Sequence, residues 1–175
     1  ISLGPYMTKR LVKKRIEYSK IFEISNWATG LEENEERELK NKEIIRNIEN
    51  YFTILYTGNL GLVHDWETII KCFQNYRYLS NNCRLIFIGK GSGFKNAKKY
   101  VKKNNLSKYI IFENLLPISE FNTLINSCSI SLVSLKKGYE GLVVPSKLFG
   151  YLARKKPVIY IGPNSDVSHF IKKSK

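Results

Sequence analysis

From residue 52 onward, short apolar runs alternate with longer segments of helical periodicity. The runs are rich in Ile, Val, Tyr and Phe and are apolar at nearly every position, as is typical of strands buried on both faces of a parallel sheet. The expected strands are 52–56, 85–88, 109–112, 130–135 and 158–161. The expected helices are 66–79, 94–103, 119–127, 146–154 and 166–172. This order predicts the α/β class, with a Rossmann-like parallel sheet and helices on both of its faces.

The first fifty residues do not follow this alternation. Residues 5–16 are expected to form a basic helix, 20–24 a strand and 26–30 a turn. Because about thirty residues cannot build a domain alone, residues 1–30 are interpreted as the end of a preceding domain and its connection. Residues 31–50 hold seven glutamates and are expected to form a charged linker or exposed helix. The main domain is expected to span 51–175 and to be truncated at its C-terminal end.

Positive charge is concentrated in the expected main domain. The net charge is +14, of which residues 51–175 contribute +13. Such a field attracts nucleic acid, anionic lipid headgroups or a nucleotide diphosphate, although a solvated lysine-rich surface gives the same excess. Several of the lysines are expected on the solvent side of one helix: Lys95, Lys98, Lys99, Lys102 and Lys103. With 43% hydrophobic and 25% charged residues, the composition is that of a globular protein, and no apolar run reaches the roughly 18 residues of a membrane span.

The three cysteines do not form a recognisable site. Cys72, Cys83 and Cys128 include no CxxC pair and have no neighbouring histidine. A disulfide scaffold and a zinc site are therefore not expected. All three lie in apolar stretches, which predicts small buried side chains in a reducing cytosol.

Two glycine-containing loops follow the first two expected strands, where ligands of open parallel sheets bind. In the first, Gly58 and Gly61 allow close approach of the backbone to a ligand, and Asp65 is an expected N-cap of the next helix. The second, 89–93, reads GKGSG. It is a poor match to a dinucleotide fingerprint, which needs its third glycine where Phe94 stands, so a turn before a helix is expected.

A third loop follows the fourth strand and precedes the helix at 146–154. Pro145 suits the first turn of this helix, whose N–H groups favour an anion. Lys147 adds a positive charge at the same place. The segment predicts an anion site, with a routine junction between loop and helix as the alternative.

Four segments together resemble the carboxy-terminal domain of group 1, family 4 glycosyltransferases: GNLG at 58–61, HDWET at 64–68, EGLVVPSKL at 140–148 and KPVI at 156–159. The resemblance covers nearly the whole chain. It implies half of a GT-B fold, in which two Rossmann-like domains enclose the active site and the second domain holds a nucleotide-sugar donor.

The resemblance also implies the site residues. Backbone amides around Gly141 to Val143, with the start of the following helix, are expected to hold the donor diphosphate. The full set of expected donor-binding residues is Gly58, Asn59, Gly61, His64, Glu140, Gly141, Leu142, Val143, Ser146 and Lys147.

Several positions depart from the family pattern or have an alternative role. Many family members carry an Arg and a Lys after the first strand, where this chain has Asn59 and His64, so Lys147 is expected to supply the charge. Glu140 is the candidate catalytic residue near the transferred sugar, and Gly150 stands where a ribose-contacting Glu is usual. The alternatives are an exposed loop carboxylate for Glu140 and a turn-closing role for His64; Trp66 is expected in the core.

The function implied is that of a retaining glycosyltransferase in polysaccharide biosynthesis. Its expected partners are a UDP- or GDP-sugar and a glycan or lipid-linked acceptor, without nucleic acid and without a metal or other cofactor. The intact protein is expected in the cytoplasm, peripheral to the inner face of the plasma membrane, and the isolated chain is expected to be inactive. A GT-B-like sugar-nucleotide epimerase and a basic nucleic-acid-binding module remain as alternatives.

Overall fold

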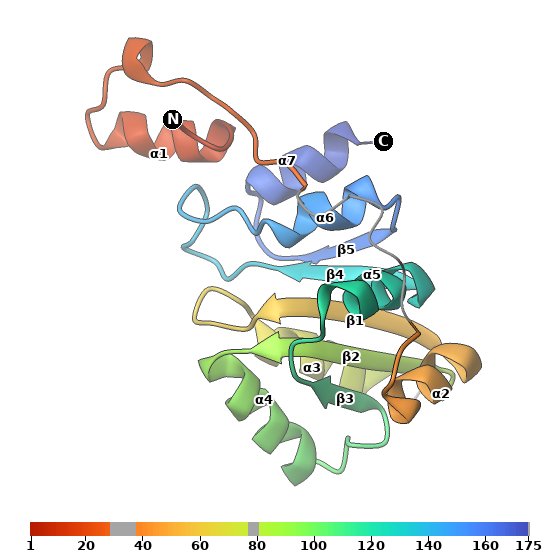
Figure 1. The fold of residues 1–175 in the computed structure, drawn as a ribbon. Coiled ribbons are helices and arrows are strands. Elements are labelled where there is room, and N and C mark those ends of the chain that lie inside the picture. Colours follow the sequence, from red (N-terminus) through yellow and green to blue (C-terminus); the bar gives the residue numbers. More distant parts are fainter. Residues whose placement is uncertain (29–37, 77–80, 175) are drawn as a thin grey trace.

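The computed structural model describes residues 1–28, 38–76 and 81–174 and contains one parallel sheet (Figure 1). The strand order is β3-β2-β1-β4-β5. The strands are β1 (Phe52–Asn59), β2 (Cys83–Lys90), β3 (Ile110–Glu113), β4 (Ile130–Ser134) and β5 (Val158–Ile161). All neighbouring pairs are parallel, which confirms the α/β, Rossmann-like prediction.

Helices cover both faces of the sheet. Those on the sheet are α2 (Lys42–Asn50), α3 (Trp66–Tyr76), α4 (Ser92–Lys103), α5 (Ile118–Ser127), α6 (Lys147–Ala153) and α7 (Asp166–Lys173). The amino-terminal segment adds α1 (Pro5–Lys13) and a 3-10 turn η1 (Tyr18–Lys20). Side chains of α3 and α4 belong to one core cluster, and side chains of α2, α5, α6 and α7 belong to the other. The domain therefore has three layers, with the sheet in the middle.

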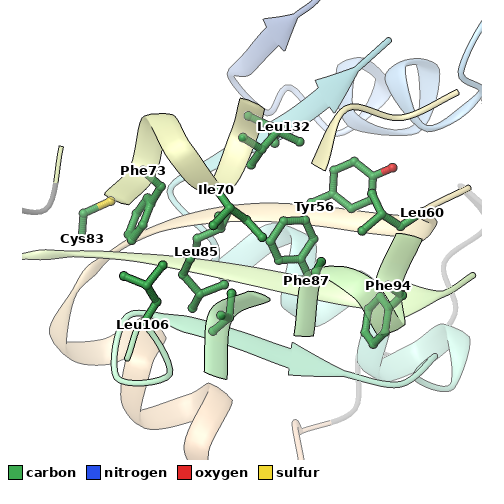
Figure 2. Packing of buried hydrophobic residues seen from close by; sticks show 14 residues of the cluster. Tyr56, Leu60, Ile70, Phe73, Cys83, Leu85, Phe87, Phe94, Leu106 and Leu132 are labelled. Atoms are coloured by element: carbon green, nitrogen blue, oxygen red, sulfur yellow. The ribbon is translucent and has the colours of Figure 1, made fainter. Parts of the chain in front are cut away.

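The interior strand β2 contributes side chains to both clusters. Its side chains alternate between the faces, so Leu85 and Phe87 pack under α3 and α4 (Figure 2), while Ile86 and Ile88 pack on the opposite side. All four are almost completely buried. This two-sided burial explains the uninterrupted apolar run in the sequence.

The expected strands and helices of the main domain are confirmed, with ends shifted by a few residues. β1 and β2 run further than expected because Gly58 and Gly89 continue the parallel pairing. Asp65 caps α3 as expected, since its carboxylate accepts hydrogen bonds from the Thr68 N–H and hydroxyl. The expected end of that helix, in 77–80, lies outside the described residues.

The front of the chain differs from its prediction. The expected strand 20–24 is wrong: it contains the end of η1 and a single bridge between Ser2 and Glu23. Two backbone bonds flank that bridge, which is too little pairing to continue a strand. The first helix ends at Lys13, earlier than expected, and the expected turn 26–30 is described only to residue 28, without regular structure.

The predictions for the charged stretch 31–50 and for the three cysteines are only partly confirmed. Residues 29–37 lie outside the described residues, but α2 packs on the sheet, with Ile44 fully buried in the core. Asn41 caps this helix through the N–H groups of Glu43 and Ile44. Cys83 and Cys128 are buried as expected, whereas the expectation for Cys72 is wrong because its side chain is exposed on α3.

The amino-terminal segment extends away from the sheet but is attached to the main domain (Figure 1). The N–H of Tyr6 donates to Asp166 Oδ1 at 2.8 Å, which joins the start of α1 to α7. Arg10 Nη1 donates to the Glu140 carbonyl at 3.4 Å. A side chain at Gly141 would meet the Tyr6 carbonyl oxygen, so this glycine permits the close contact between α1 and the loop.

Candidate functional site

A pocket of about 510 Å³ opens at the carboxyl ends of β1 and β4. These two strands lie where the strand order changes direction, the position at which open parallel sheets bind ligands. Its polar wall is formed by Thr57, Gly58, Asn59, His64, Ser146 and Lys147. The remaining lining residues are Trp27, Ala28, Ile118, Phe121, Ile125, Val143, Val144, Pro145, Gly150, Tyr151 and Arg154.

Lys147 is the most unusual group in this pocket. Its Nζ atom is buried, has no hydrogen-bond partner among the described residues, and lies 3.7 Å from the centre of the Tyr56 ring. Burial lowers the pKa of Lys147 to about 7, because a charged ammonium loses hydration there. Gly58, with φ +94°, has no side chain to fill the space beside this ammonium. The arrangement leaves a cation that an anion in the pocket could neutralise.

His64 does not provide a second cation. Its ring is buried, and Nδ1 lies 3.0 Å from the Ser134 carbonyl oxygen, so Nδ1 carries the proton and donates. Burial, followed by repulsion from Lys147, lowers the pKa of His64 to about 4. The imidazole is therefore neutral at pH 7 and helps to join the loop after β1 to β4.

A buried tyrosine attaches α6 to the strand below the pocket. The Tyr151 hydroxyl accepts the N–H of Thr57 at 3.1 Å and is hydrogen-bonded to the Thr57 hydroxyl at 2.6 Å. Burial raises the pKa of Tyr151, so the phenol stays protonated. This pair fixes α6 relative to the carboxyl end of β1.

The loop before α6 has two parts with different hydrogen bonding. The N–H groups of Leu142 and Val143 both donate to the Tyr139 carbonyl, at 3.0 and 3.3 Å. By contrast, the N–H groups of Val144, Ser146 and Lys147 have no hydrogen-bond partner in the described part of the chain. All three residues line the pocket. The available donors thus lie slightly later in the loop than Gly141 to Val143.

The pocket brings together only some of the expected donor-binding residues: Gly58, Asn59, His64, Val143, Ser146 and Lys147. Gly61, Glu140, Gly141 and Leu142 are not part of its lining. The Glu140 carboxylate accepts the Gly138 N–H at 2.8 Å within its own loop, and Leu142 is half exposed. The catalytic and ribose-binding assignments stay predictions.

The sequence reasoning missed the other wall of the pocket. Trp27, from the amino-terminal segment, lines the pocket and is 67% exposed, and residues of α5 such as Phe121 line it as well. Arg154 also lines it, and donates to the Gly150 carbonyl at 3.1 Å and to Asn122 Oδ1 at 2.6 Å. The spacing of Gly150 and Arg154, one helical turn apart, was a sequence signal for the contact between these two residues.

Comparison with known families identifies the chain. The family model described as "Glycosyl transferases group 1" matches residues 37–175. The chain belongs to this family. This group 1 glycosyl transferase chain is 29% identical over 106 residues to "Probable glycosyltransferase WbjE" of Pseudomonas aeruginosa, and the match covers 61% of the chain and 26% of WbjE.

Solved structures agree with the fold of this glycosyl transferase chain. S. aureus TarM in complex with UDP has a TM-score of 0.67 at 14% identity, and the match covers 99% of this chain and 35% of TarM. The apo form of the lipopolysaccharide outer core galactosyltransferase WaaB has a TM-score of 0.62 at 13% identity, and the match covers 98% of this chain and 50% of WaaB. The C-terminal domain of LpcC from Francisella tularensis gives 0.53 at 15% identity, with 77% and 80% covered.

These comparisons confirm half of a GT-B fold. The glycosyl transferase chain spans about a quarter of WbjE and half or less of TarM and WaaB. Among its described residues, no group of three His, Cys, Asp or Glu side chains is arranged to hold a metal ion. No helix in the described ranges is long and apolar enough to span a membrane.

Proposed function

We propose that this chain carries the donor site of a retaining glycosyltransferase that uses a UDP- or GDP-sugar. The observation that carries the proposal is the buried, unpartnered Lys147 ammonium in the pocket between β1 and β4. The unbonded N–H groups of Val144 and Ser146 add donors beside it. Family membership supports sugar transfer as the chemistry of the intact protein.

The pocket lining offers groups that suit both parts of a nucleoside diphosphate. Lys147 and the nearby N–H groups offer a cation and donors for phosphate oxygens. Trp27, Ile118 and Phe121, which also line the pocket, offer apolar surface for a base and ribose. The volume of about 510 Å³ is in the usual range for small-molecule sites.

In the proposed reaction, negative charge grows on the diphosphate as the bond to the sugar breaks. The Lys147 ammonium is buried and the neighbouring N–H groups are held in place by the backbone, so they stabilise that charge with little reorganisation. We propose no metal in this role. Glu140 remains a candidate near the sugar, provided that its carboxylate exchanges the Gly138 N–H for substrate.

The acceptor is proposed to be a glycan or a lipid-linked molecule bound with help from the rest of the protein. The isolated chain is therefore expected to bind nucleotide without turnover. An epimerase would use the same donor without an acceptor, so acceptor-independent isomerisation by the intact protein would favour that alternative. Preference for a short duplex over UDP would favour a nucleic-acid module.

Titration of the chain with UDP and GDP tests the proposed site. We expect saturable binding of at least one nucleotide, with a dissociation constant of about 1 mM or tighter, because the diphosphate neutralises the buried Lys147. Isothermal titration calorimetry measures it, and uridine serves as the ligand control because it lacks the diphosphate. Equal heats for UDP and uridine would contradict a diphosphate site.

The intact protein is further proposed to work in the cytoplasm at the inner face of the plasma membrane. The +13 charge of residues 51–175 supports attraction to anionic lipid. We expect the chain to sediment with phosphatidylglycerol vesicles more than with neutral phosphatidylcholine vesicles, and the difference should shrink in high salt. Sedimentation that is the same with both lipids would remove this support.

A further inference from the structure

A second pocket lies at the other end of the strands, beside the amino ends of β1 and β2. Its volume is about 250 Å³. It is lined by Glu43, Arg46, Asn47, Tyr51, Arg84 and the pair 107–108. It shares no residue with the proposed donor pocket, and the proposed function gives it no role.

Arg84 forms the fixed part of this pocket. The residue is only 3% exposed, and its guanidinium carbon lies 3.5 Å from the centre of the Tyr51 ring and 5.2 Å from that of Tyr109. Its Nη1 donates to the Asn81 and Cys83 carbonyls, each at 2.8 Å. Two ring contacts and two hydrogen bonds thus hold the guanidinium in one orientation.

Part of this guanidinium remains available for a ligand. Nε and Nη2 of Arg84 make no hydrogen bond within the described residues, and neither belongs to the buried atoms without a partner. Arg84 is part of the pocket lining, although the residue as a whole is only 3% exposed. These two nitrogens are therefore the donors that a ligand in the pocket would use. A planar guanidinium with N–H donors on one side suits the paired oxygens of a phosphate group.

The charge around the pocket is also positive. Arg46 and Lys108 line it with exposed side chains, and Glu43 is the one acidic residue in its lining. No salt bridge between Glu43 and these cations exists in the described part of the chain. Three cations against one carboxylate leave an excess that an anion would neutralise.

We propose that this pocket binds a phosphate group, either on a small dissolved molecule or on a lipid headgroup. Arg84 supplies the oriented donors, while Arg46 and Lys108 supply charge at the rim. The pocket has about half the volume of the proposed donor pocket, which favours a single phosphate group over a whole nucleotide. This site is independent of the donor site and would survive failure of the proposed function.

Calorimetric titration of the 175-residue chain with inorganic phosphate at low salt tests the proposal. We expect the double variant R46Q/K108Q to bind phosphate about tenfold more weakly, since both rim charges are lost while the Arg84 contacts remain. The matched control is K98Q/K99Q, which removes two exposed lysines from α4, and it should bind like the unchanged chain. Loss of phosphate binding in K147M, with none in R46Q/K108Q, would assign the phosphate to the donor pocket and overturn the proposal.

Vesicles distinguish the two sources of the phosphate group. Sedimentation with phosphatidic acid vesicles that decreases in R46Q/K108Q but not in K98Q/K99Q identifies a headgroup as a ligand. Phosphate binding that depends on Arg46 and Lys108, without this difference in sedimentation, identifies a dissolved ligand. If the two double variants behave alike in both experiments, the pocket has no specific phosphate site and the proposal fails.

Discussion

Replacing Lys147 with methionine is expected to weaken UDP binding by about a hundredfold, the effect of losing a charge-assisted contact of nearly 3 kcal/mol. The same change should make the ligand-free chain more stable, because a buried ammonium without a partner is replaced by an apolar side chain of similar length. The contact with the Tyr56 ring offsets part of that gain. A substitution that weakens ligand binding but raises the stability of the free chain indicates that the original residue serves binding and not folding.

Calorimetry with UDP and urea unfolding measure the two effects on K147M. The control is K98M, the same substitution at an exposed position of α4, which should change neither quantity appreciably. If K147M binds UDP as well as the unchanged chain, Lys147 does not contact the diphosphate. If K147M binds UDP poorly and is also less stable than the unchanged chain, damage to the fold explains the weaker binding. The donor-site assignment then loses its support.

The pH dependence supplies an additional measurement on the same residue. With a pKa of about 7, Lys147 is mostly neutral at pH 8 in the free chain, and a bound diphosphate favours its charged form. UDP binding at pH 8 should therefore take up nearly one proton, seen as a buffer-dependent heat, and K147M should show none. His64 contributes little, because its pKa of about 4 keeps it neutral throughout.

Stability without ligand should follow the same ionisation. Between about pH 7 and the ordinary lysine pKa of 10.5, the unfolded chain binds a proton at this position that the folded chain has released. The contribution of Lys147 to the free energy of unfolding therefore rises with pH across this window. K147M should lack that rise, and an identical profile for both proteins would show that the Lys147 ammonium is not buried.

Strands β1, β2 and β4 could be predicted because most of their residues are buried, on both faces of the sheet. The run from Leu85 to Ile88 is almost completely buried, so its apolar character identifies an interior strand without further information. The segment 20–24 failed for the opposite reason. Its apolar residues Phe22 and Ile24 are exposed in this structure, so their hydrophobicity did not indicate a strand.

The candidate site was only partly predictable. Gly58 lies at the carboxyl end of β1, and Lys147 follows the loop after β4, and the topology of parallel sheets brings such positions together. Trp27 reaches the pocket from outside the sheet, by a route that no local pattern encodes. The bonding of Leu142 and Val143 to the Tyr139 carbonyl was equally hidden, because it depends on the conformation of the loop.

Gly89 offers the largest expected effect on stability. It has φ +154° and is paired with Gly58 on the neighbouring strand, and a Cβ atom there would lie 2.0 Å from the Gly58 carbonyl oxygen. Because both atoms belong to the backbone, no side-chain rotation relieves the overlap, and β1 and β2 must separate. We expect Gly89→Ala to lower the free energy of unfolding by about 3 kcal/mol or more, as measured by urea unfolding.

Gly138 provides the matched control for this substitution. Its φ of +95° is also unfavourable for alanine, but nothing lies within 4 Å of the added Cβ. Gly138→Ala should therefore cost only the backbone strain, about 1 kcal/mol. If both variants lost the same free energy of unfolding, the positive φ angle would be the sole reason for glycine at both positions. The close approach of the two strands at Gly89 would then contribute nothing measurable. A much larger loss of stability in Gly89→Ala would show that the fold requires the close approach of β1 and β2. That approach also matters for the donor pocket, because β1 carries Gly58 beside the Lys147 ammonium.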